Sequence, residues 1–224
     1  MNPGVFFECF FDIVYLISVI TIGFIMVFTK EANKQYTLLA YMCILLGLGD
    51  CFHLIPRIIS KFVNESEKVT AAIGYGNAIS SITMAFFYIL FMELLAIRYN
   101  LKLTVIRPIV YILFACRVIC ILLPQNDWKH NSHDRTMSII RNIPFIIIGI
   151  FIVYLLIAYA TKKEDPLRLM WIFVCISFGC YIPVAIIHLG VPWDPILMVI
   201  KTLAYVAIVV VGFCGISPVD LKYD

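Results

Sequence analysis

Apolar residues run along this chain in seven long segments, and short polar or charged stretches separate them. The segments cover residues 6–28, 36–59, 71–97, 103–123, 137–160, 167–189 and 195–215. An α-helix needs about 20 residues to cross the hydrocarbon core of a bilayer, and each segment is about that long. We therefore expect an all-α membrane protein of seven transmembrane helices, which form a single domain over residues 1–224.

Composition agrees with a protein embedded in a membrane. Hydrophobic residues make up 62% of the chain and charged residues 14%, and the mean hydropathy is +0.98. Charged residues make up about 25% of a typical soluble domain. We therefore expect an integral membrane protein whose main partner is the lipid bilayer. The net charge of +3 is spread over short loops and does not indicate nucleic-acid binding.

The lysines and arginines between the segments are distributed unevenly, and this predicts the orientation of the chain. Nine lie in or beside the first, third and fifth loops and the tail, against four in the second and fourth loops. Cytoplasmic loops are enriched in lysine and arginine. We therefore expect the N-terminus outside and the C-terminus in the cytoplasm, and we assign the chain to the plasma (cytoplasmic) membrane.

The densest polar group within an apolar segment lies in the second segment. In a helix, Asp50, His53 and Arg57 are spaced i, i+3 and i+7 and project within roughly 60° of one another. Charged groups do not face lipid, so this face must look toward other helices or water. Pro56 lacks a backbone N–H, so we expect the helix to bend beside the cluster.

Ionisable residues of the other segments fall in the same outer layer of the membrane. In the predicted orientation this layer also contains Glu8, Asp12, Arg117, Arg141, His188 and Lys201. Glu93 is the exception, because it lies on the cytoplasmic side, close to Arg98. Six segments thus contribute to one polar layer, which predicts a shared site.

Cations dominate this layer, and they predict a pocket that receives negative charge. Charge-assisted hydrogen bonds to an anion are strong in a dry site. We expect Arg57, Arg117 and Lys201 to supply the positive charge, and His53 to titrate near neutral pH and couple binding to protons. The candidate ligand-binding residues are Asp50, His53, Arg57, Arg117, Tyr181, His188, Lys201 and Tyr205.

The same layer is compatible with three functions. We favour a non-enzymatic transporter or ligand sensor whose outward-opening pocket holds an anionic or zwitterionic small molecule or a lipid headgroup. One alternative is an intramembrane lipid-modifying enzyme with a metal or acid/base centre at Asp50, His53 and His188. The other is a structural membrane subunit, in which Asp50 forms an ion pair with Arg57 or Lys201. Nothing in the pattern predicts an oligomeric state.

The cysteines and the remaining histidines do not form a known metal-binding pattern. All eight cysteines fall inside apolar segments, without a CxxC pair or zinc spacing, which is typical of small packing residues. His130 and His133 lie in the fourth loop beside two aspartates, and we expect a solvated loop there. We therefore predict no catalytic residue, no metal and no cofactor.

Overall fold

The structure is helical, as the apolar segments predict. The computed structural model describes residues 3–30, 32–63, 66–131, 134–161, 165–186 and 193–218, which contain no strand. The long helices are α1 (Pro3–Val27), α2 (Lys34–Ser60), α3 (Glu67–Arg98), α4 (Ile106–Leu122), α5 (Arg135–Leu155), α6 (Met170–Ile186) and α7 (Trp193–Gly215). The short ones are the 3₁₀-helix η1 (Pro124–Asn126), the π-helix η2 (Leu156–Ala160), which continues α5, and the 3₁₀-helix η3 (Pro166–Leu169), which leads into α6.

Six helices of the described chain are long and apolar enough to cross a membrane. They are α1, α2, α3, α5 with η2, η3 with α6, and α7. Helix α4 has 17 residues and is therefore about 26 Å long, slightly less than the hydrocarbon thickness of about 30 Å. The chain is thus a membrane-type helical bundle, whereas the seventh span and the orientation remain predictions.

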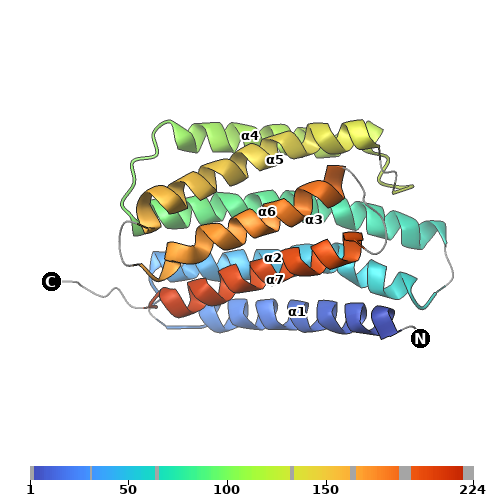
Figure 1. Ribbon diagram of the computed structural model, residues 1–224, viewed down its shortest axis with the longest axis horizontal. Coiled ribbons are helices and arrows are strands. Elements are labelled where there is room, and N and C mark those ends of the chain that lie inside the picture. Colours follow the sequence, from blue (N-terminus) through green and yellow to red (C-terminus); the bar gives the residue numbers. More distant parts are fainter. Residues whose placement is uncertain are drawn as a thin grey trace.

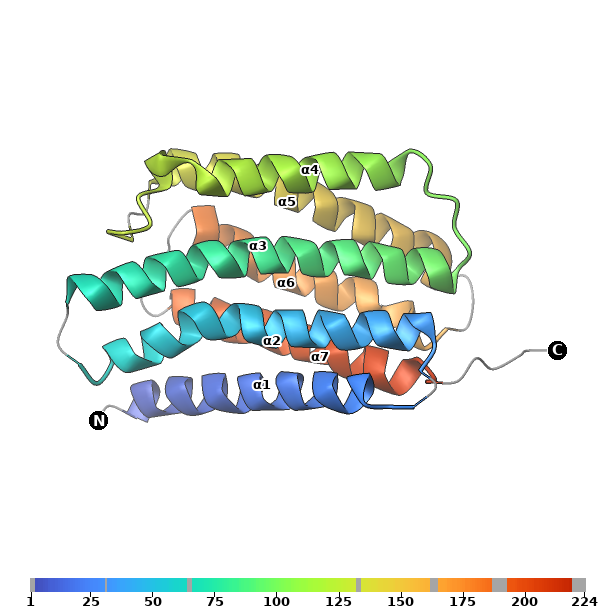
Figure 2. The ribbon, with the colours of Figure 1, turned by 180° about the vertical axis from the view of Figure 1, so that it is seen from behind.

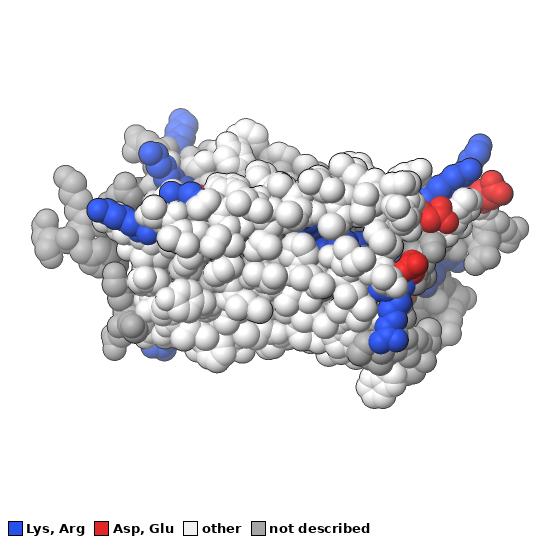
Figure 3. All heavy atoms as spheres, turned by 90° about the horizontal axis from the view of Figure 1, so that it is seen from above, with Lys and Arg blue, Asp and Glu red and all other residues white. Residues whose placement is uncertain are grey.

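The outer surface has the polarity expected of a bilayer-spanning protein. On the face shown in Figure 3, charged side chains gather at the two ends, and the surface between the ends shows almost no charged side chains. Ile17, Ile112 and Ile150, on three different helices, are 61%, 63% and 61% exposed. Lipid tails are as apolar as these side chains, so their exposure is compatible with a membrane.

The helices form a closed ring. Each packs against the next in sequence, α7 packs back on α1, and α3–α5 and α2–α7 contacts cross the interior. Figures 1 and 2 show the long helices side by side, with successive helices running in opposite directions. Helices α1, α3, α5 and α7 therefore begin at one end of the bundle, which we call the N-terminal end, and finish at the C-terminal end.

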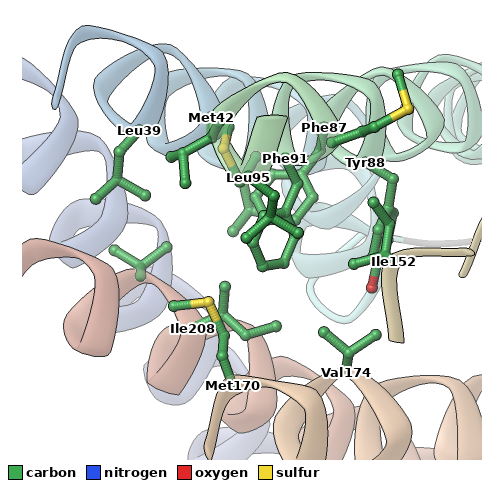
Figure 4. Packing of buried hydrophobic residues seen from close by; sticks show 14 of the residues in the cluster. Leu39, Met42, Phe87, Tyr88, Phe91, Leu95, Ile152, Met170, Val174 and Ile208 are labelled. Carbon is green, nitrogen blue, oxygen red and sulfur yellow. The ribbon is translucent and has the colours of Figure 1, made fainter. Parts of the chain in front are cut away.

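Apolar side chains fill the half of the ring nearer the C-terminal end. Figure 4 shows this packing, to which α2, α3, α5, α6 and α7 all contribute. Phe91, Leu95 and Met42 are no more than 1% exposed, and Val174 and Ile208 are fully buried. The interior polar residues of the second, fourth and seventh segments lie in the other half. The polar layer is therefore packed against the apolar core on its C-terminal side.

Charged side chains at the C-terminal end form ion pairs with one another. Arg98 donates to both carboxylate oxygens of Asp165, at 2.9 and 3.1 Å. Arg107 does the same to Glu93, at 2.8 and 2.9 Å. Glu93, which we expected close to Arg98, is therefore paired with a different arginine, because Asp165 at the start of η3 occupies Arg98. Tyr111 adds a hydrogen bond to Glu93 at 3.1 Å.

Two glycines let α2 and α3 approach each other closely. A Cβ atom on Gly76 would lie 2.1 Å from the carbonyl oxygen of Phe52, and one on Gly49 would lie 2.1 Å from Oγ1 of Thr83. Pro56 has no N–H, so the Phe52 carbonyl lacks its usual helical donor. Helix α2 nevertheless continues for another turn, and Figure 2 shows its last turns leaving the line of the preceding ones.

Replacing Gly76 by alanine tests this contact. The new Cβ meets a backbone oxygen, so the helices must move apart, and we expect a loss of about 1–3 kcal/mol in stability. Gly179→Ala in α6 is the matched control, because nothing lies within 4 Å of its added Cβ. Thermal unfolding of the purified proteins checks this, and equal midpoints for the two variants would contradict it.

Candidate functional site

Three cavities lie in the half of the ring nearer the N-terminal end, and Lys201 lines all of them. The carboxylate cavity, of about 30 Å³, lies between α1, α2 and α7. The arginine cavity, of about 40 Å³, lies between α3, α4, α5, α6 and α7. The vestibule, of about 180 Å³, reaches from Trp128 and Asn131 in the loop after α4 to Lys201.

The polar residues of the candidate site divide among these cavities. The charged and imidazole residues of the carboxylate cavity are Glu8, Asp12, Asp50, His53, Arg57 and Lys201. The arginine cavity is lined by Ser80, Ser81, Met84, Arg117, Phe145, Tyr181, Lys201 and Tyr205. The vestibule shares His53, Met198 and Lys201 with the first, and Ser80, Ser81, Tyr181 and Lys201 with the second. Seven of the eight predicted site residues thus line these three adjacent cavities.

Asp50 is held by hydroxyl groups and not by a cation. Its two carboxylate oxygens accept hydrogen bonds from Tyr15 and Ser80, both at 2.7 Å. The glycine contacts between α2 and α3 bring Ser80 within this reach. An ion pair of Asp50 with Arg57 or Lys201, expected for a structural subunit, is absent from the described chain. Hydrogen bonds to a carboxylate are stronger than neutral ones, so the hydroxyls stabilise the buried charge.

Arg57 forms an ion pair within the protein. Its guanidinium forms an ion pair with Glu8 of α1, and Lys61 lies 3.6 Å from the other oxygen of the same carboxylate. One carboxylate thus faces two cations, and the role of Arg57 in supplying charge to a ligand stays a prediction. The pair fixes the N-terminal ends of α1 and α2 against each other.

Asp12 lines the carboxylate cavity and is 7% exposed. Within the described chain it forms no hydrogen bond and no ion pair. It lies one helical turn after Glu8 and one turn before Tyr15, so these three polar side chains of α1 face α2 and α7. The cavity of about 30 Å³ beside this carboxylate has room for about two water molecules.

Arg117 is 1% exposed, and all its hydrogen-bond acceptors are neutral. Nε donates to the Ser81 carbonyl at 3.1 Å, and Nη1 donates to the Arg141 carbonyl at 3.0 Å and to Oδ1 of Asn142 at 3.1 Å. Its guanidinium carbon lies 4.1 Å from the centre of the Phe145 ring. These contacts hold the side chain in place but leave its positive charge without a carboxylate.

Arg141 and Lys201 are also without a carboxylate partner in the described chain. Arg141 donates to Asn126 at 2.8 Å and to Ser138 at 2.9 Å, and stacks over Trp128 at 4.7 Å. The Lys201 ammonium lies 5.1 Å from the centre of the Tyr181 ring and 5.7 Å from that of Tyr205. Cation–π contacts of this kind stabilise a positive charge without neutralising it.

The two predicted tyrosines are already hydrogen-bonded within the protein. Tyr181 donates to Oδ1 of Asn142 at 2.7 Å, and Tyr88 donates to the Tyr205 hydroxyl at 3.4 Å. Their rings, rather than free hydroxyls, face Lys201. Asn142 also accepts from Arg117 and donates to the Ser138 carbonyl at 2.8 Å, so it joins α4, α5 and α6.

Several residues of this network are absent from the eight predicted site residues. They include Tyr15, Ser80, Asn126, Ser138, Arg141 and Asn142. Ser138, Arg141 and Asn142 are spaced i, i+3 and i+4 on one face of α5, a pattern visible in the sequence. Asn126 also caps α4 by donating to the carbonyls of Cys120 and Ile121 and to that of the C-cap residue Leu123, while its oxygen accepts from Arg141.

Metal ligands and relatives give no direct information on function. Among the residues that the structure describes, no group of three histidine, cysteine, aspartate or glutamate side chains is placed to hold a metal. The predicted site residue His188, like His133, lies outside the described residues. No protein-family model, curated protein or solved structure matches the chain. Its function is therefore inferred from its own side chains.

Replacing Asp50 by asparagine tests the two hydroxyl hydrogen bonds that Asp50 accepts. Asparagine brings an amide donor to a place where Tyr15 and Ser80 both donate, so we expect a loss of about 1–3 kcal/mol in stability. Tyr15→Phe and Ser80→Ala should each destabilise the protein less when added to Asp50→Asn than when made alone. Unfolding measurements on this mutant cycle check this, and strictly additive losses would contradict it.

Proposed function

We propose that this chain is an integral membrane protein that binds an oxyanion in the space around Lys201, as a transporter or a ligand sensor. The ligand is a small molecule or a lipid headgroup with a phosphate, sulfate or carboxylate group. One observation supports this most strongly. Arg117, Arg141 and Lys201 line two adjacent cavities that share Lys201, and no described carboxylate lies within ion-pair distance of any of these three cations.

Buried charges are expensive unless they are paired, so this excess of cations favours a negative ligand. Arginine has five N–H donors, and the three hydrogen bonds of Arg117 use three of them. None of these three hydrogen bonds uses Nη2, and we assign its donors to the ligand. Arginine binds the paired oxygens of carboxylate and phosphate groups, whereas Lys201 adds a point charge from α7.

The vestibule supports entry from the N-terminal end. Its lining includes Trp128 and Asn131 of the loop after α4, and it continues inward to Lys201. A cavity of about 180 Å³ suits a small molecule or a headgroup better than a whole lipid. In the predicted orientation this end faces outside, so the ligand would enter from there.

An acid/base enzyme has weaker support. The separation of 3.9 Å between His53 Nδ1 and Asp50 Oδ1 is the observation in its favour. Ser80, the hydroxyl that touches this pair, donates to Asp50 and not to the imidazole, so its oxygen is not activated by His53. We therefore prefer binding to catalysis.

Sulfate and inorganic phosphate are suitable probes of the oxyanion site. We expect both to bind the purified wild-type protein, measured by calorimetry in nanodiscs of phosphatidylcholine. Lys201→Met should weaken this binding roughly tenfold to a hundredfold, because it removes one charged hydrogen bond and keeps most of the side-chain volume. Arg107→Gln is the control, because Arg107 is paired with Glu93 away from the cavities.

The source of the oxyanion is distinguished by lipid composition. If the natural ligand is a headgroup, nanodiscs that contain phosphatidylglycerol should inhibit sulfate binding to the wild type. If it is a free small molecule, the two nanodiscs should give the same sulfate affinity. Equal sulfate binding by wild type and Lys201→Met would contradict the proposal.

The proposed orientation predicts which lysines are accessible from outside the cell. Lys129, beside the vestibule, and Lys102, at the C-terminal end, are both exposed and are matched positions. We expect a membrane-impermeant maleimide to label Lys129→Cys in intact cells and to label Lys102→Cys only after permeabilisation. The reverse pattern would contradict an outward-facing vestibule, and absence of both from the cell surface would contradict the plasma membrane assignment.

A further inference from the structure

His53 stands between the carboxylate cavity and the vestibule, and lines both. Its Nδ1 atom is buried and has no hydrogen-bond partner among the described residues. The nearest carboxylate oxygen, Oδ1 of Asp50, lies 3.9 Å away, just beyond hydrogen-bond distance. The imidazole therefore lies beside a carboxylate oxygen with which it forms no hydrogen bond.

The charges around His53 nearly balance. On the side of the carboxylate cavity three carboxylates and two cations share the lining with His53, and a third cation lies beside one of the carboxylates. They are Glu8, Asp12, Asp50, Arg57, Lys201 and, beside Glu8, Lys61. On the side of α3 and the vestibule it meets the neutral Asn77 and Ser80, with Arg141 of α5 in the same lining. Asp50 attracts a proton to the ring, whereas Lys201 and Arg57 repel it.

A bound oxyanion changes this balance. An anion in the vestibule faces both Lys201 and His53, because both line that space. It offsets the positive potential of Lys201 and offers the ring an acceptor other than Asp50. Opposite charges close to an imidazole favour its charged form. Protonation would then give the ring two anionic acceptors.

We propose that His53 takes up one proton when an oxyanion binds, so that the protein binds its anion together with a proton. The proton comes from hydronium or the buffer acid in the surrounding solution. An N–H bond forms at the unprotonated ring nitrogen, and the donor's bond to that hydrogen breaks, which leaves water or the buffer base. This inference rests on the proposed oxyanion site and adds its regulation. Binding becomes tighter as the pH falls, and each bound anion brings one unit less of net negative charge into the membrane.

The chain contains its own control for this pair. Asp127 and His130 have the same i, i+3 spacing as Asp50 and His53, with Nδ1 2.7 Å from the carboxylate oxygen. Their side chains are 44% and 66% exposed, and neither lines the three cavities. A change at His130 therefore removes an equivalent histidine without touching the site.

Proton uptake can be measured directly with sulfate, which stays fully ionised where an imidazole titrates. Calorimetry of the wild type in two buffers of different ionisation enthalpy, between about pH 6 and pH 8, gives the protons taken up per sulfate. We expect about one proton, and a sulfate affinity that rises up to about tenfold for each unit of falling pH. His53→Gln should take up none, whereas His130→Gln should match the wild type.

The outcomes separate the two proposals. Sulfate binding by the wild type without proton uptake would overturn the role of His53 and leave the oxyanion site intact. Absence of sulfate binding would overturn both. Uptake that persists in His53→Gln and is lost in Asp12→Asn would assign the proton to Asp12. If His53→Gln does not fold, ¹⁵N-histidine spectra of the wild type with and without sulfate decide, and no ring protonation at His53 would contradict the inference.

Discussion

The hydrocarbon core of a membrane offers no partner to a charged side chain, so each charge must find its partner in the protein or in a bound ligand. Arg117 shows this constraint most clearly. It is almost fully buried, and its hydrogen bonds and ring contact join α4 to α3 and α5. Helix α4 is short and, unlike α5 and α6, it is not lengthened by a 3₁₀- or π-helix that is continuous with it. The guanidinium therefore fixes the position of α4 and, with it, one wall of the arginine cavity.

Charges in this protein are satisfied in two different ways. At the C-terminal end, Arg98 and Arg107 each form a bidentate pair with a carboxylate, and at the N-terminal end Arg57 pairs with Glu8. All three pairs hold helices together. The two at the C-terminal end have no remaining charge for a ligand, whereas Glu8 is shared between Arg57 and Lys61. Arg117 and Lys201 are held instead by carbonyls, amides and aromatic rings. Neutral partners fix a cation while leaving its charge available.

The elements of this fold are visible in the sequence, but the pairing of its charges is not. Long apolar runs predict the helices because their length matches the bilayer. The spacing of Asp50, His53 and Arg57 places them on one face, and all three line one cavity. That Arg57 pairs with Glu8, and Asp50 with two hydroxyls, depends on which helices become neighbours and how closely α2 and α3 approach. Those distances arise only from the packed ring, so a single sequence does not determine them.

The central claim is that the space around Lys201 holds an oxyanion, and native mass spectrometry of the gently purified protein tests it most directly. We predict a bound mass that corresponds to a molecule or lipid with a phosphate, sulfate or carboxylate group in the wild type. The same mass should be absent from Lys201→Met and present in Arg107→Gln. A wild-type protein without any bound species, or a species retained equally by Lys201→Met, would contradict the account.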